Sequence, residues 1–171
     1  MIEESNRKLA REVSNNKFKN AQEKLISKYK AFIYVEIIMI FYIIFFIGLN
    51  PLVADRYRLV NIIYWCCFFM VEIGVDTYLL RRVKLIDIYN SSVSDIAKNA
   101  AENWKLHKLA LVLGLPLAFG AIILVALAFQ AHYYTILGMI AGGLIGCIIG
   151  LFQLNKFREY YRLLQSDEKW N

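Results

Sequence analysis

Four long apolar blocks alternate with charged segments along this 171-residue chain. The blocks cover residues 31–49, 59–80, 109–129 and 134–154, and each contains 19 to 22 residues. A helix needs about 20 apolar residues to cross the hydrocarbon core of a bilayer. Buried helices of a soluble bundle keep a polar face, whereas the third and fourth blocks are apolar all round. The pattern therefore predicts four transmembrane helices.

The polar stretches between the blocks predict how these helices connect. Residues 50–58 separate the first two blocks, and residues 130–133 separate the last two. Because such short loops join antiparallel neighbours, we expect two transmembrane hairpins, residues 31–80 and 109–154. A longer linker, residues 81–108, joins the two hairpins. The expected fold is thus an all-α integral membrane protein with helical extensions outside the bilayer.

Basic residues are distributed unevenly among the segments outside the blocks. Of the 20 Lys and Arg residues, 18 lie in residues 1–30, 81–108 and 155–171. Only Arg56 and Arg58 fall on the opposite side. The positive-inside rule therefore predicts that both termini and the linker are cytoplasmic. The hydrophilic start of the chain does not resemble a cleavable signal peptide, so we expect the first span to act as a signal anchor.

The cytoplasmic segments have helical patterns of their own. Residues 1–30 carry apolar side chains at three- and four-residue steps: Leu9, Val13, Phe18, Ala21, Leu25 and Tyr29. This pattern predicts a basic amphipathic helix, broken at residues 14–16, that either lies on anionic lipid headgroups or docks a cytosolic partner. In the linker we expect a break at residues 90–92 and a new helix capped by Ser92 or Ser94. With the tail, residues 155–171, four helices extend into the cytoplasm and could pack together.

The last block contains a row of glycines, each four residues after the one before. The row consists of Gly138, Gly142, Gly146 and Gly150. A second helix can approach such a row closely, and the third block offers a small face at Ala110, Gly114 and Ala118. We expect these two helices to pack as a tight hairpin. The alternative is that the glycines pack against a second copy of the chain.

Three acids interrupt the first two apolar blocks. Glu36 and Glu72 each lie about 20 Å below the outer membrane boundary, and Asp76 lies one turn deeper. Charged groups inside a span are costly, so such residues are candidates for function. The acids could be structural, sharing a proton or pairing with basic residues near the inner boundary, namely Arg81, Lys105, His107 or Lys108. Alternatively, they form a proton- or cation-coupled transport site, or they simply meet water at the membrane surface.

The sequence contains no motif that predicts an enzyme. We find no nucleophile elbow, no phosphate-cradling glycine loop and no zinc-protease helix motif. Cys66, Cys67 and Cys147 lie inside apolar blocks and have no histidine nearby in the sequence, so neither a disulfide nor a metal site is predicted. We therefore expect no catalytic residue, no cofactor and no nucleic-acid partner.

Two segments of the chain resemble a group of small four-span inner-membrane proteins of the Bacteroidetes. They cover residues 76–98 and 138–164, and they include Ile86-Asp87 followed by Ser92-Val93. The resemblance implies a helical hairpin, a basic linker and a glycine-rich last span in a bacterial inner membrane. It implies no activity and no functional residue.

The distribution of hydrophilic sequence leads to two functional hypotheses. Most of the polar sequence is expected on the cytoplasmic face, which favours a non-enzymatic accessory or adaptor protein that presents this face to a cytoplasmic partner. The alternative is a small proton- or cation-coupled transporter or channel that uses Glu36, Glu72 and Asp76 and acts as an oligomer. Partners expected on either view are anionic lipid headgroups, a cytoplasmic protein or a second copy of the chain.

Overall fold

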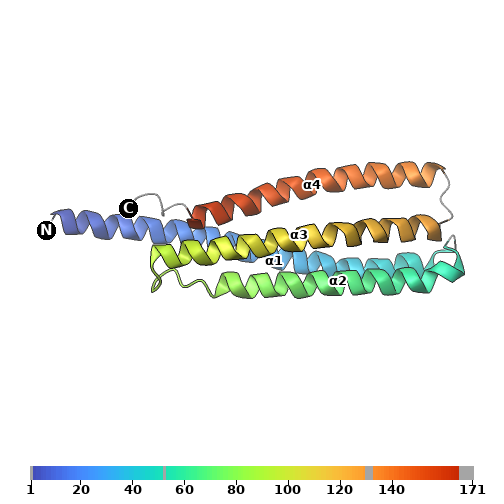
Figure 1. The fold of residues 1–171 in the computed structure, drawn as a ribbon, viewed down its shortest axis with the longest axis horizontal. Helices are drawn as coiled ribbons and strands as arrows, with labels where there is room; N and C mark the ends of the chain where they lie inside the picture. The colour runs from blue at the N-terminus through green and yellow to red at the C-terminus, as the bar shows by residue number, and fades with distance from the viewer. Residues whose placement is uncertain (1, 52, 130–132, 166–171) are drawn as a thin grey trace.

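The computed structural model describes residues 2–51, 53–129 and 133–165 and is all-α within them. The helices are α1 (Ile2–Leu49), α2 (Asp55–Lys84), α3 (Val93–Ala128) and α4 (Tyr133–Gln165). They run up and down along one long axis (Figure 1). Residues 85–92, together with the start of α1 and the end of α4, lie at one end of the molecule, the linker end. Residues 50, 51, 53 and 54 lie at the other, the loop end. The two predicted antiparallel hairpins are confirmed.

Each helix contains a stretch long and apolar enough to cross a membrane. In the most apolar window of each helix, at most 11% of the residues are buried within the protein. A soluble bundle of this size would have to bury far more of its apolar side chains, whereas lipid covers such side chains in a bilayer. The chain is a multi-pass membrane protein, as its four apolar blocks predict.

The four helices form a ring in which each contacts two neighbours. The pairs in contact are α1–α2, α2–α3, α3–α4 and α4–α1. Among the described residues, the backbones of α1 and α3 do not approach each other, and neither do those of α2 and α4. Long side chains are therefore needed to reach across the ring.

The largest core lies at the linker end, where all four helices take part. Its most buried large side chains are Phe18, Leu25 and Tyr29 of α1, Leu79 and Val83 of α2, Ile96 of α3, and Phe157, Tyr161 and Leu164 of α4. The prediction that the four helical extensions pack together is confirmed. The prediction that the apolar face of residues 18–29 rests on lipid headgroups is wrong, because this core buries that face. The expected break at residues 14–16 is also wrong, since α1 is continuous through them.

Side chains hold the turn between α2 and α3. Asp87 accepts hydrogen bonds from the backbone N–H groups of Tyr89 and Asn90, at 3.0 Å each. Ser92 caps α3 by accepting from the Asp95 N–H at 3.1 Å, which confirms the predicted cap. Gln22 of α1 donates to the Val83 and Ile86 carbonyls, at 2.8 Å each. The turn is therefore fastened to α1 as well as to itself.

The loop end has a smaller core and a basic residue with a structural role. Arg58 donates hydrogen bonds to the carbonyls of Gly48, Asn50 and Val53, at 3.0 to 3.3 Å. Helix C-termini leave carbonyls without partners, and a cation there also suits the helix dipole. One of the two basic residues on this side of the molecule thus closes the end of α1.

The expected tight packing of α3 against the glycine row of α4 is wrong. A side chain added at Gly138, Gly142, Gly146 or Gly150 would meet no atom within 4 Å, and residues 140–152 are all exposed. On α3, a Cβ at Gly114 would lie 2.8 Å from Glu72 Oε1, so α2 already occupies part of the small face formed by Ala110, Gly114 and Ala118. At the linker end, by contrast, Phe157 and Tyr161 bind α4 to the common core. Packing of the glycine row against a second copy stays a prediction.

Candidate functional site

The three membrane-embedded acids belong to the neighbouring helices α1 and α2, and the Glu72 carboxylate lies beside Gly114 of α3. Glu72 and Asp76 are four residues apart and so project from one face of α2. Both are close enough to Glu36 of α1 for their charges to act on it. All three side chains are partly buried, and Glu36 Oε2 is fully buried with no hydrogen-bond partner among the described residues. The α1–α2 hairpin therefore assembles an acid cluster, defined as Glu36, Glu72 and Asp76.

No basic side chain in the described part of the chain forms an ion pair with this cluster. Arg81 and Lys105 are exposed, and Lys108 lies over the Trp104 ring at 5.7 Å. His107 instead contacts the Tyr29 hydroxyl. The structural hypothesis that the acids pair with these basic residues is therefore wrong. The alternatives of a shared proton, a transport site and contact with water at the membrane surface remain.

A row of polar contacts connects α2 to α3 on the loop-end side of the acids. Asn61 donates to the Leu124 carbonyl at 3.1 Å, and the Tyr64 hydroxyl donates to the Leu117 carbonyl at 2.9 Å. Glycines make room for this row, because a Cβ at Gly120 would lie 2.8 Å from the Tyr64 hydroxyl oxygen. In the same way, a Cβ at Gly114 would lie 2.8 Å from Glu72 Oε1. Sequence analysis missed these contacts, although Asn61 stands out as a polar residue inside an apolar block.

A second buried polar cluster lies at the linker end, just outside the apolar blocks. The Tyr29 hydroxyl is 3.0 Å from His107 Nδ1 and 3.0 Å from the Tyr161 hydroxyl. Phe157 and Trp104 stack on the His107 ring, with ring centroids 4.6 and 5.6 Å apart. Three helices thus meet at one aromatic and polar cluster, which we call the Tyr–His cluster: Tyr29, His107 and Tyr161.

Burial determines the protonation of the Tyr–His cluster. It lowers the pKa of His107 to about 4, so this side chain is neutral near pH 7. It also raises the pKa of Tyr29 and raises that of Tyr161 to about 12. In one arrangement that satisfies both contacts, Tyr161 donates to Tyr29 and Tyr29 donates to His107 Nδ1. The cluster is therefore an uncharged hydrogen-bonded chain.

Asp76 is the member of the acid cluster that interacts with the Tyr–His cluster. Its charge acts on both Tyr29 and Tyr161, as well as on Glu36. The titratable side chains therefore form a path through the protein. It begins at Glu36 and Glu72, passes Asp76 and ends at the Tyr–His cluster. Sequence analysis identified the acids but treated His107 only as a partner for them. Tyr29 and Tyr161 gave no separate signal, because aromatic residues at helical spacing are also typical of an ordinary core.

The remaining chemistry of the described residues is sparse. Within residues 2–51, 53–129 and 133–165, no three His, Cys, Asp or Glu side chains are grouped so that they could hold a metal ion. Cys66, Cys67 and Cys147 are free thiols.

Comparisons with family models, with curated proteins and with solved structures find no match to this chain. The resemblance to a group of Bacteroidetes membrane proteins stays a prediction.

Proposed function

We propose that this protein is a small membrane transporter or channel that moves protons, alone or coupled to a cation, through the acid cluster. The observation that carries the proposal is the gathering of Glu36, Glu72 and Asp76 on two neighbouring spans, with no ion pair to a described basic residue. Ionised side chains inside a span are costly and, where they occur, commonly mark an ion or proton pathway. Neighbouring carboxylates reduce that cost by holding protons, which is the property that a proton carrier requires.

The Tyr–His cluster supplies a continuation of the pathway towards the linker end. Hydroxyl groups and a neutral imidazole both donate and accept hydrogen bonds, so they can pass a proton along a chain. Asp76 is the acid that acts on Tyr29 and Tyr161 and would exchange protons with this chain. The buried position of the cluster excludes bulk water from competing with the relay.

The distribution of charge supports an orientation for this activity. Both termini and the linker carry 18 of the 20 Lys and Arg residues, which favours a cytoplasmic linker end. On this proposal the protein lies in a bacterial inner membrane with the Tyr–His cluster facing the cytoplasm. Protons would reach the acid cluster from the loop end and leave through the linker end.

Proton flux into liposomes tests the proposal. Purified protein is reconstituted with a pH-sensitive dye inside the vesicles, and the rate of internal pH change is measured after an external acid step. We expect the double variant Glu36→Gln/Glu72→Gln to reduce the rate to that of protein-free vesicles. Glu23→Gln makes the same chemical change at an exposed site on α1 and should keep the full rate. An unchanged rate in the double variant would contradict the proposal.

An adaptor function is the second candidate, and the linker-end bundle favours it. All four helices contribute to this core, which extends beyond the inner ends of the apolar blocks. Crosslinking in cells followed by purification tests it. The deletion should remove residues 1–11 only, because Phe18, Leu25 and Tyr29 belong to the core and their loss would unfold the bundle. A stoichiometric protein partner lost on this deletion would support the adaptor function.

A further inference from the structure

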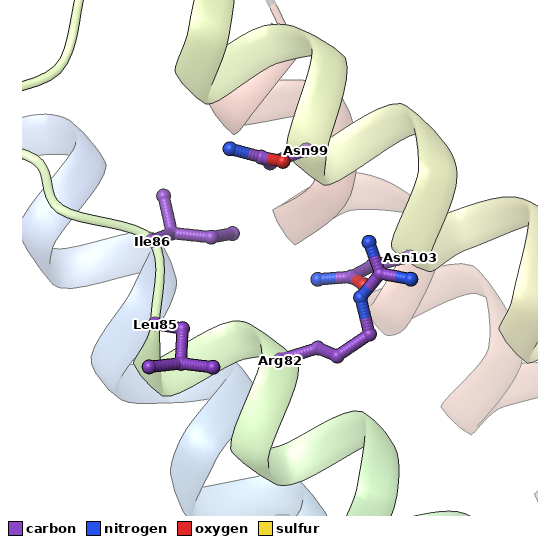
Figure 2. A pocket seen from close by; sticks show the side chains of 5 residues that line it. All are labelled: Arg82, Leu85, Ile86, Asn99 and Asn103. Carbon is purple, nitrogen blue, oxygen red and sulfur yellow. The ribbon is translucent and has the colours of Figure 1, made fainter.

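A pocket of about 200 Å³ opens at the linker end, where α2 ends and α3 begins. It is lined by Arg82, Leu85, Ile86, Asn99 and Asn103. Figure 2 shows the Arg82 and Asn103 side chains together at one side of the pocket, with Leu85 and Ile86 at the other. None of these residues belongs to the acid cluster or to the Tyr–His cluster. The pocket therefore needs an explanation of its own.

Asn103 gives the first indication of a ligand. Its side chain is only 1% exposed, and its Oδ1 atom has no hydrogen-bond partner among the described residues. Buried polar atoms are almost always paired, so an orphan acceptor at the wall of a pocket indicates a missing donor. A ligand for this pocket should therefore carry an N–H or O–H group.

Arg82 gives the second indication. Its Nη2 atom donates to Glu102 Oε2 at 3.1 Å, and its side chain also contacts Tyr78. A guanidinium has five N–H donors in a planar fork, so these contacts leave donors for a further anion. The fork matches the oxygen geometry of a phosphate in particular. Asn99, on the same face of α3, adds a second carboxamide to the pocket wall.

The position and size of the pocket indicate which anions it can bind. Arg82 follows the second apolar block by two residues, which places it at the level of lipid headgroups. Leu85 and Ile86 provide an apolar wall beside the polar one. The volume is below the range of about 300–1,000 Å³ that is typical of drug-sized ligands and suits a single headgroup or a small metabolite.

We propose that this pocket binds a phosphate group whose ligand also carries a hydrogen-bond donor, with Arg82 holding the phosphate and Asn103 accepting from the donor. Phosphoethanolamine has both groups, and it occurs either as a lipid headgroup or as a free phosphate ester. The two sources share this chemistry and differ in whether acyl chains are attached. The proposal is independent of proton transport.

Two binding measurements on the full-length protein in mild detergent separate the sources. Native mass spectrometry records which lipid is retained from an equimolar mixture of phosphatidylethanolamine, phosphatidylglycerol and phosphatidylcholine. Isothermal titration then measures binding of free phosphoethanolamine and of inorganic phosphate. Retained phosphatidylethanolamine supports a lipid ligand, whereas binding of free phosphoethanolamine without lipid retention supports a soluble one.

Matched variants establish that the binding belongs to this pocket. We expect Arg82→Gln to weaken binding about 10- to 100-fold, the usual effect of losing a charged hydrogen bond. Arg81→Gln makes the same charge change at the neighbouring exposed residue and should change binding less than about twofold. Arg82→Lys keeps the positive charge but not the planar fork of donors, so its affinity should lie between those of Arg82→Gln and Arg81→Gln. It also serves as a control for misfolding of Arg82→Gln. Binding that is absent, or equal in all four proteins, would overturn the proposal.

Discussion

The linker end and the membrane-spanning middle of this protein are held together by different forces. At the linker end, all four helices bury large aromatic and aliphatic side chains against one another. In the middle, residues 140–152 of α4 are exposed, and α2 and α3 are joined by polar contacts from Asn61 and Tyr64. Burial of apolar surface drives association in water, but lipid is as apolar as leucine and gives no such drive. The same four helices therefore pack tightly outside the bilayer and loosely within it.

The largest expected effect compares two phenylalanines of α4. Phe157 is 2% exposed in the linker-end core, whereas Phe152 is 66% exposed to the bilayer. Phe157→Ala should lower the free energy of unfolding by about 3–5 kcal/mol, because it leaves a cavity. Phe152→Ala should change that free energy by less than about 0.5 kcal/mol. Unfolding in detergent mixtures, followed by circular dichroism, measures both, and equal losses would contradict the contrast between the two regions.

A pH dependence of stability should follow from His107 in the linker-end core. Its pKa is about 4 in the fold, against about 6.5 in an unfolded chain. As the pH falls below about 6.5, the unfolded chain takes up a proton that the fold does not. The associated stability, complete above pH 6.5, is then lost progressively until about pH 4. By proton linkage, the free energy of unfolding should be about 2 kcal/mol lower at pH 5 than at neutral pH.

His107→Gln removes this titration but keeps a polar side chain that can contact Tyr29. Unfolding of wild type and variant is compared at pH 7.5 and pH 5. Between these two pH values, the free energy of unfolding of the wild type should fall by about 2 kcal/mol more than that of the variant. Identical losses would show that His107 is not held neutral by burial.

A smaller effect is expected from the polar contacts within the membrane. Tyr64→Phe removes the hydroxyl that donates to the Leu117 carbonyl. Hydrogen bonds between membrane helices contribute about 0.6 kcal/mol on average and at most about 1.7 kcal/mol. Tyr34→Phe is the control, because Tyr34 is exposed on α1. If only Tyr64→Phe lowers the free energy of unfolding, the hydrogen bond from Tyr64 to Leu117 stabilises the protein. Equal free energies of unfolding for the two variants would contradict that role.

The smallest effect on stability is expected at the glycine row of α4. Nothing lies within 4 Å of a Cβ at Gly146, so Gly146→Ala should leave the fold unchanged or stabilise α4 by up to about 1 kcal/mol. If the row instead packs against a second copy of the chain, the larger substitution Gly146→Leu should break that contact. Analytical ultracentrifugation in detergent decides between these outcomes. A monomer in both wild type and variant would exclude the oligomer under those conditions.

The sequence predicted those features that depend on local pattern. Block length predicted the four spans, and the serines at the end of the linker predicted a cap of α3 by Ser92 or Ser94, of which Ser92 is the one that forms it. Features that depend on which helix faces meet could not be predicted. The apolar face at Phe18 and Leu25 suits lipid headgroups and a protein core equally well by its spacing. Three helix-weakening residues at 14–16 cost only a few tenths of a kcal/mol each, which the neighbouring core contacts outweigh.

The candidate site was predicted in part for the same reason. An acid in an apolar block can be recognised from the sequence alone. Counting residues from the outer boundary then placed Glu36 level with Glu72. The Tyr–His cluster and the Arg82–Asn103 pocket combine residues from separate helices and carry no local motif. The contact between Gly114 and Glu72 also depends on the relative rotation of α2 and α3. Only the tertiary arrangement fixes that rotation.

Proton flux into liposomes that contain one of two Glu36 variants shows whether the acid cluster carries protons. Glu36→Asp keeps a carboxyl group in the acid cluster, and Glu36→Gln replaces it with an amide of the same size as glutamate. We expect the aspartate variant to retain flux well above that of protein-free vesicles, and the glutamine variant to fall to that level. Equal flux through both variants and the wild type would show that the acid cluster does not carry protons.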